Sequence, residues 1–313
     1  TDAAFAAGTE AERIPFGELK NDPVQFAPPD DVSPAHFYLL LEEKVPTRIV
    51  STTIVDLAVR GHLRIEEVDN GDDYRLERID SDKPLLKFEQ FLMNSLFLDG
   101  STVLISSLKY SFAEDSTKIR NMIYSDARAQ RWFLGRPDRV RAAWAVGGFL
   151  LFLTGIGITA LAAYNIGRGV LFAPIAAAGI VVAAGARWMP AKTPRGSGLA
   201  GRARGFAYFL EQSEAYRSKI AEEAHIFTEY LPYVMAIGAT DKWTKAFDGI
   251  HVEEPEWFSG RRGFAPVYFG HQMDLFAVSA ASTLSAVQSS SGSSGFSGGF
   301  SGGGGGGGGG GSW

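Results

Sequence analysis

The chain has 313 residues, of which 45% are apolar and 21% charged, and its net charge at pH 7 is −5. It contains no cysteine, which excludes disulfides, thiolate catalysis and cysteine-ligated zinc or iron–sulfur centres. Nucleic-acid binding relies on a strongly basic surface, so the sequence pI of about 5.6 argues against nucleic acid as a partner.

The N-terminal part predicts a linker followed by a small module. Residues 1–27 are rich in Ala, Glu, Asp and Pro without a sustained period, which is typical of a linker. The first 35 residues contain no apolar segment of the kind found in signal peptides. Residues 28–80 then begin with Ser33 as a suitable N-cap and Pro34 as the first residue of a helix to Glu43.

A second helix and a hairpin complete this module. The helix follows Ser51 and ends at Gly61, and alternating apolar residues on both sides of an Asp-Asn-Gly turn at 69–71 predict two antiparallel strands. Two helices followed by a two-stranded wing are arranged in the order of a winged-helix domain. The predicted fold class is therefore mostly α with short β wings.

One interpretation places the helix from Thr52 to Arg60 in a DNA groove, with nearby arginines on the phosphates (Arg48, Arg60, Arg64, Arg75 and Arg78). Acidic residues are interleaved with these arginines (Asp56, Glu66, Glu67, Asp69, Asp72, Asp73 and Glu77). Because these carboxylates would repel a phosphate backbone, we favour a protein-contact or purely structural role.

Residues 81–135 predict a second small helical module, which is also compatible with a wing. Apolar residues from Leu85 to Leu96 lie on one helix face, and a short strand covers Val103 to Ile105. A long amphipathic segment then runs from Asp115 to Phe133. We expect this module to pack on the first.

Residues 142–186 give the strongest signal in the chain. The segment 142–164 contains 23 uncharged residues, about the length that an α-helix needs to cross a hydrocarbon core roughly 30 Å thick. The segment 169–186 is also uncharged, and only four residues link the two, so the pattern predicts an antiparallel transmembrane hairpin. The spans contain no ionisable residue, which favours an anchor over a conducting pore.

Flanking residues predict the orientation and packing of this hairpin. Ten basic residues flank it, whereas its link holds only Arg168 (the ten are Arg128, Arg131, Arg136, Arg139, Arg141, Arg187, Lys192, Arg195, Arg202 and Arg204). By the positive-inside rule, we expect a multi-pass membrane protein with both flanks cytoplasmic. Trp144, Tyr164 and Trp188 are the expected interface anchors. Close helix packing is expected at small residues (Gly155, Gly157, Gly179 and Ala183).

Residues 187–274 predict a cytoplasmic helical region. An amphipathic helix from about Gly201 ends at Pro232, and its acidic polar face suits anionic lipid poorly, so we expect it to pack on the preceding modules rather than on the bilayer. Residues 241–247 predict one or two further helical turns, and the ordered part is expected to close near Gly260.

Residues 275–313 form a Ser/Gly-rich tail that is expected to be disordered alone, because it cannot bury enough apolar surface to offset its chain entropy. The tail is either a solvated end or a tether. In the second interpretation, Phe296, Phe300 and Trp313 are anchors for a groove in another protein or for the bilayer interface.

Sequence motifs for chemistry are missing. The five histidines are scattered, and none forms the i, i+4 pair with a glutamate that marks a helical zinc site (His36, His62, His225, His251 and His271). The sequence contains no nucleophile elbow, phosphate loop or kinase signature. We therefore expect no enzyme activity, catalytic residue, metal or cofactor.

Several landmarks together resemble one family. They are the Pro28-Pro29-Asp30 segment, the stretch from Asp56 to Ile65, Met189 to Thr193, the segment Phe227 to Tyr233, Trp257 to Gly260 and the glycine tail with its terminal Ser312-Trp313. The chain resembles the cytoplasmic and C-terminal portion of the predicted bacterial membrane proteins grouped as domain of unknown function 2207. The resemblance implies that a signal peptide, an extracytoplasmic β-rich domain and a first membrane helix precede Thr1. It implies no catalytic residues.

These features predict a membrane-anchored interaction protein that serves in scaffolding or signalling at the bacterial cytoplasmic membrane. Its expected partners are the lipid bilayer and either another protein or a second copy of the chain. The alternative is an accessory subunit of a membrane transport or envelope-export complex, in which the small residues of the hairpin pack on helices of a partner.

Overall fold

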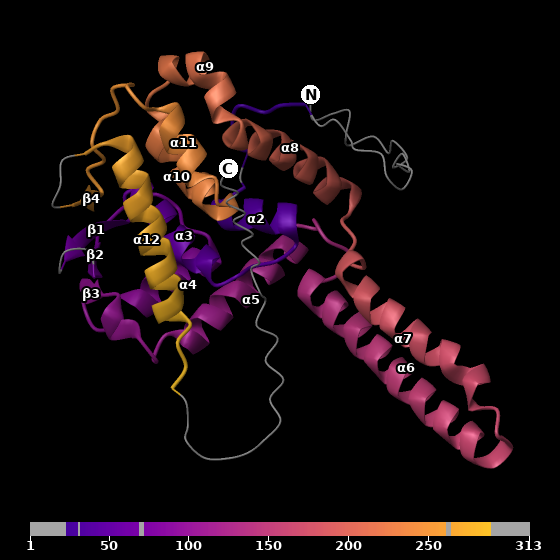
Figure 1. The fold of residues 1–313 in the computed structure, drawn as a ribbon. Helices are drawn as coiled ribbons and strands as arrows, with labels where there is room; N and C mark the ends of the chain where they lie inside the picture. The colour runs from indigo at the N-terminus through magenta and orange to yellow at the C-terminus, as the bar shows by residue number, and fades with distance from the viewer. Residues whose placement is uncertain (1–22, 31, 69–71, 261–263, 289–313) are drawn as a thin grey trace, which may run out of the picture.

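The computed structural model describes residues 23–30, 32–68, 72–260 and 264–288. A helical body is built from the described residues before Pro137 and after Trp188, and a long helical hairpin projects from it (Figure 1). Residues 1–22 of the predicted linker and the proposed tail anchors Phe296, Phe300 and Trp313 lie outside the described residues.

The first two helices confirm the predicted capping. Helix α2 (Pro34–Glu42) begins at Pro34, and the Ser33 hydroxyl accepts a hydrogen bond from the His36 amide at 3.4 Å. Helix α3 (Arg48–Val59) starts earlier than predicted, and Gly61 follows it with a φ of +81°. A left-handed φ of this kind favours glycine, which explains why the chain turns there.

In the part of the chain that the structure describes, four short strands form one sheet in the order β3-β2-β1-β4. The predicted hairpin is confirmed as β1 (Leu63–Val68) and β2 (Asp73–Arg78), paired antiparallel. Strand β3 (Thr102–Leu104) pairs with β2, and β4 (Phe258–Ser259) pairs in parallel with β1. Residues 81–135 thus extend the sheet of residues 28–80 and share its core instead of forming a separate module.

Helices α4 (Lys87–Leu96) and α5 (Ala113–Ala129) follow the predicted apolar faces, with a single 3₁₀ turn at Ser106–Leu108 between them. Helix α3 lies at the centre of the body, against α2, α10 (Ile226–Ile237) and α12 (Pro266–Leu284). Every residue of α3 from Ile49 to Ala58 is buried. The interpretation that places this helix in a DNA groove is therefore wrong, because its surface is already covered by protein.

The region after the hairpin differs from the single helix predicted between Gly201 and Pro232. Helix α8 (Pro194–Glu211) ends at Gln212, and a 3₁₀ turn (Ser213–Tyr216) and α9 (Arg217–Glu222) precede α10. Pro232 lies inside α10 instead of ending it, because α10 is an apolar helix buried against the body, where packing offsets the one backbone bond that proline removes. Helix α11 (Thr240–Ala246) confirms the predicted helical turns.

The expected packing of this region on the body is confirmed. Phe206 and Phe209 are fully buried beside the aromatic rings of Phe37, Tyr230 and Trp243. Each ring pair has an edge-on geometry, which contributes about 0.5–1.5 kcal/mol beyond the burial of area. This aromatic cluster joins α8, α10 and α11 to α2.

The ordered part of the chain does not end near Gly260, and the boundary of the tail at residue 275 is wrong. Helix α12 spans residue 275 and buries apolar side chains at intervals of four, three, four and four residues (Phe269, Met273, Phe276, Ala280 and Leu284). The Ser51 hydroxyl donates to the carbonyl of Ala277 at 2.9 Å, which fixes α12 against α3. The low charge of this segment reflects a helix that packs on the core.

The two predicted spans form an antiparallel helical hairpin. Helix α6 (Pro137–Ile166) and helix α7 (Ala173–Gly185) lie side by side, with a 3₁₀ turn at Gly169–Phe172 at the tip and another at Ala186–Trp188 at the base (Figure 1). Within the part of the chain that the structure describes, the hairpin meets the body near its base and projects away from it beyond that point. The rest of its length therefore requires a different environment from the body.

Candidate membrane hairpin and its joint with the helical body

The outward surface of α6 and α7 is apolar over most of its length. Both spans, Pro137–Asn165 and Gly169–Trp188, are long and apolar enough to cross a membrane, and little of either is buried. Large apolar side chains are exposed along both helices and in the 3₁₀ turn at the tip (Val146, Phe149, Leu150, Leu153, Ile156, Leu161, Val170, Leu171, Ile180 and Val181). Soluble proteins rarely expose a continuous apolar surface of this size, which indicates contact with lipid or with another protein.

Glycines bring the two helices of the hairpin together at backbone distance. A Cβ atom on Gly155 would lie 2.7 Å from the Cα of Ala176, and one on Gly179 would lie 2.7 Å from the Cα of Phe152. A Cβ atom on Gly148 would likewise lie 2.8 Å from the Cα of Ala183. The packing roles of Gly155, Gly179 and Ala183 within the hairpin thus follow from the geometry.

Gly157 differs from the other glycines, because a Cβ added there would meet nothing within 4 Å. It faces away from α7 and does not serve the hairpin's own packing. Sequence reasoning missed Gly148, although its position seven residues before Gly155, on the same helix face, is a usable signal.

Polar side chains within the hairpin satisfy their hydrogen bonds locally. The hydroxyls of Thr154 and Thr159 donate to the carbonyls of Leu150 and Gly155, each at 2.8 Å. The Asn165 amide donates to the carbonyl of Leu161 at 2.9 Å. A hydrocarbon environment offers no other partner, so this arrangement suits a membrane span.

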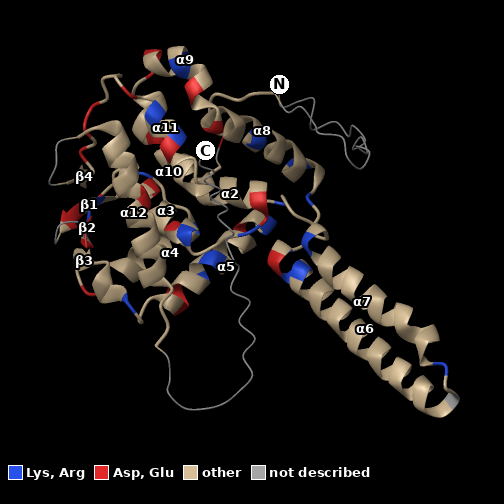
Figure 2. Ribbon diagram, viewed as in Figure 1, with Lys and Arg blue, Asp and Glu red and all other residues tan. Residues whose placement is uncertain are grey.

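The three proposed interface anchors are exposed near the two ends of the hairpin. Trp144 is 46% exposed and Trp188 66% exposed toward the base, and Tyr164 is 88% exposed near the tip. The Arg187 guanidinium carbon lies 3.8 Å from the centre of the Trp188 ring. Figure 2 shows basic residues where the hairpin meets the body and again in the link at the tip, with a long stretch free of charge between them.

Glu43 joins both arms of the hairpin to the body. Its carboxylate accepts hydrogen bonds from Arg141 on α6 at 3.0 Å and from Lys192, which follows α7, at 2.5 Å. Arg141 also donates to the backbone carbonyl of Glu43 at 2.7 Å. All three side chains are at most 20% exposed, so water screens these pairs only in part.

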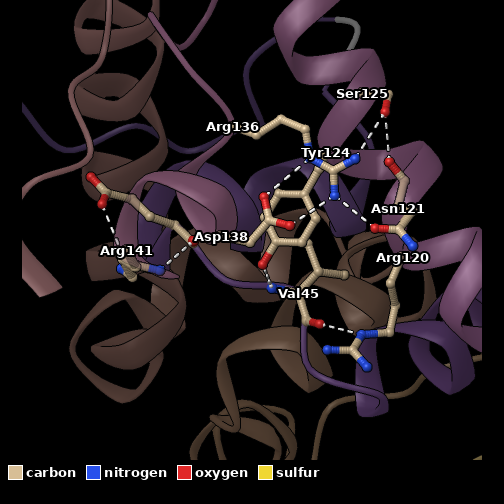
Figure 3. Close-up of polar contacts among 9 residues, drawn as sticks. Val45, Arg120, Asn121, Tyr124, Ser125, Arg136, Asp138 and Arg141 are labelled. Carbon is tan, nitrogen blue, oxygen red and sulfur yellow. Dashed lines mark hydrogen bonds and ion pairs between the residues drawn. The ribbon is translucent and has the colours of Figure 1, made fainter. Parts of the chain in front are cut away.

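A second polar cluster connects the start of α6 with α5 (Figure 3). The Arg136 guanidinium donates to Asp138 at 2.8 Å and to the side-chain oxygen of Asn121 at 2.6 Å, and its carbon lies 5.3 Å from the centre of the Tyr124 ring. The Tyr124 hydroxyl accepts a hydrogen bond from the amide of Val45, just after α2. The start of α6 is therefore tied to α5 and, through Tyr124, to the loop that follows α2.

The segments that flank the hairpin also pair with each other. The amide of Leu134 donates to the carbonyl of Ala191 at 3.0 Å, and the amide of Thr193 donates to the carbonyl of Trp132 at 3.0 Å. Gly196 lies so close to the Trp132 carbonyl that a Cβ would collide with it. These backbone bonds and the Glu43 cluster fix the hairpin to the body as one unit.

A separate cluster of buried charges lies inside the body. The Arg60 guanidinium contacts Asp56 at 3.0 Å and Glu89 at 2.8 Å, and Glu89 is fully buried. Burial raises the pKa of Asp56 from 3.8 to about 7, because the Arg60 charge offsets the loss of water only in part and Glu89 adds repulsion. Burial and the charge of the same arginine lower the pKa of His62.

This raised pKa predicts a specific pH dependence of stability. The folded state retains the Asp56 proton where the unfolded chain releases it, so the contribution to stability is present below about pH 4 and is lost as the pH rises toward 7. We expect Asp56→Asn to reduce the fall in the free energy of unfolding with rising pH, by up to ~1.4 kcal/mol per pH unit. Urea unfolding of the detergent-solubilised protein between pH 4 and 8 measures it. The exposed Asp82→Asn is the control, and equal slopes in all three proteins would contradict the assignment.

His36 lies between a serine and an aspartate and connects two helices of the body. Its ring nitrogens are 3.1 Å from the Ser33 hydroxyl and 3.2 Å from the Asp126 carboxylate, and the residue is 1% exposed. Ser33 caps α2, so the contacts hold α2 against α5. Among the described residues, no group of three or more histidine and acidic side chains has the geometry to hold a metal ion.

A known family matches most of the chain. The family model described as "Predicted membrane protein (DUF2207) C-terminal domain" matches residues 23–247. The matched range includes the hairpin, its joint and most of the body. No curated protein and no solved structure matches the chain.

Proposed function

Because the chain belongs to the family of predicted membrane proteins with the DUF2207 C-terminal domain, we propose that it is a membrane-anchored interaction protein. The hairpin crosses the bacterial cytoplasmic membrane and holds the helical body at its cytoplasmic surface. The observation that carries this proposal is an apolar hairpin whose two arms are fixed to the body by Glu43. An anchor needs both features, because the outer surface of the hairpin has to contact lipid and its base has to be connected rigidly to the body.

The body serves in contacts with protein, in scaffolding or signalling. Its order of two helices and a hairpin resembles a winged helix, and the burial of α3 supports a role in protein contact over one in a nucleic-acid groove. The mixed charges along β1 and β2 suit a protein partner better than a phosphate backbone.

A second candidate function is supported by Gly157. This residue lies on the outer face of α6 with nothing within 4 Å of an added Cβ, so a helix of another membrane protein has room to approach it. This arrangement suits an accessory subunit of a transport or envelope-export complex. Purification in mild detergent distinguishes the two functions, because only the second requires a stoichiometric membrane partner.

The orientation is tested by labelling single cysteines in a chain that has none of its own. Asn165→Cys at the tip of the hairpin and Asp80→Cys in the body are both exposed positions. With a maleimide that does not cross membranes, we expect the tip to be labelled in spheroplasts, and the body to be labelled only after the membrane is opened.

A further inference from the structure

The base of the hairpin carries a surface that is both basic and apolar. We define the basal surface as the residues Arg131, Leu134, Arg139, Arg187, Trp188, Met189 and Arg195. All four arginines are exposed, as are Leu134 at 71%, Trp188 at 66% and Met189 at 39%. Large apolar side chains gathered beside exposed arginines are costly in water, which indicates that something else covers them.

Hydrogen bonds bring together the chain segments before the first span and after the second, which carry these residues. The backbone around Arg131 and Leu134 pairs with residues 191–193, through the Thr193 hydroxyl to the Arg131 carbonyl at 2.6 Å and the Leu134 amide to the Ala191 carbonyl at 3.0 Å. Arg141 donates to the carbonyl of Arg187 at 3.4 Å, which brings the end of the second span to the start of the first. These bonds place the segments that carry the basal surface at the base of the hairpin, where both spans leave the body.

Basic residues at the base divide into two groups. Arg136, Arg141 and Lys192 are at least partly buried and pair with Asp138 or Glu43. Among the described residues, no acidic side chain pairs with the arginines of the basal surface, and the side chain of Arg187 lies over the ring of Trp188. Arg136, Arg141 and Lys192 thus connect the hairpin to the body. The arginines of the basal surface keep their N–H donors available for another molecule.

The position of the surface identifies that molecule. Because the spans begin and end beside the basal surface, the phosphates of one leaflet would lie next to its arginines. The Trp188 ring would lie at the boundary between headgroups and acyl chains. Arginine binds phosphate through paired hydrogen bonds, and its charge favours anionic lipids. We propose that the basal surface binds the headgroups of anionic phospholipids in the leaflet adjoining the body, a proposal that rests on insertion of the hairpin.

The test measures which lipids contact the full chain in phosphatidylcholine vesicles. Trace amounts of spin-labelled phosphatidylglycerol or phosphatidylcholine report the relative association of each lipid. We expect a preference of about tenfold for phosphatidylglycerol at low salt, which falls as salt screens the arginines. Arg131→Gln, Arg139→Gln, Arg187→Gln and Arg195→Gln together should remove most of the preference.

The matched control carries four glutamines at exposed basic positions of the sheet and α11, away from the hairpin base (Arg64, Arg78, Lys242 and Lys245). It should keep the full preference. Equal association of the two lipids with the unmodified chain, or an equal loss in the control, would overturn the lipid site. Release of the unmodified chain from the vesicles at alkaline pH would instead refute insertion of the hairpin, and with it the proposed function.

Discussion

Gly179→Leu is expected to force the two helices of the hairpin apart. Its Cβ would lie 2.7 Å from the Cα of Phe152, so the backbone of α6 or α7 has to move. Overpacking of this kind costs about 3 kcal/mol. The same movement would open the contacts of Gly155 with Ala176 and of Gly148 with Ala183, which depend on the same spacing between the helices.

The measurement is the thermal unfolding of the purified chain in detergent, followed by size-exclusion chromatography of heated samples. Gly157→Leu is the matched control, because it makes the same substitution in the same hairpin at a position with open space around it. We expect a large fall in the unfolding temperature for Gly179→Leu and little change for Gly157→Leu. Equal effects would show that close packing at Gly179 does not hold the hairpin together.

A second large effect is expected for Glu43→Gln. The substitution keeps the size of the side chain but removes the charge that Arg141 and Lys192 share. Two cations at most 19% exposed would then lack a counter-ion, at a cost of about 2 kcal/mol once partial access of water is allowed for. The joint should open more often, while the body and the hairpin each keep their own packing.

Hydrogen exchange locates this effect. We expect faster exchange at the amides of Leu134 and Thr193, whose bonds to the opposite segment depend on a closed joint. Glu42→Gln is the control, because the neighbouring carboxylate is exposed and its loss leaves both ion pairs of Glu43 in place. If Glu43→Gln left exchange at the joint unchanged, the ion pairs would not be what connects the hairpin to the body.

Much of the fold follows from local patterns. Ser33 and Pro34 mark the start of α2, Gly61 marks the turn after α3, and the uncharged spans mark the hairpin, because in each case one physical requirement acts over a few residues. The sequence also shows that basic residues gather in the two segments that flank the hairpin. It does not predict which of them pair with Glu43 and which stay exposed, since that depends on contacts about 100 residues apart or more.

Long-range packing explains the predictions that are wrong. Strand β3 is too short to show from sequence which strand it pairs with, so the pattern of residues 81–135 suggests a separate module. Pro232 locally predicts a helix end, although burial of α10 outweighs its cost. The C-terminal half of α12 resembles the tail because it lacks charge, although its apolar residues have helical spacing.

We propose that the hairpin crosses the membrane and fixes the body on the cytoplasmic side. The most direct test is the ratio of maleimide labelling at Asn165→Cys to that at Asp80→Cys in spheroplasts with intact membranes. We predict a high ratio that falls to about one after the membrane is permeabilised. Equal labelling of both positions before permeabilisation, or labelling of the body alone, would contradict the claim.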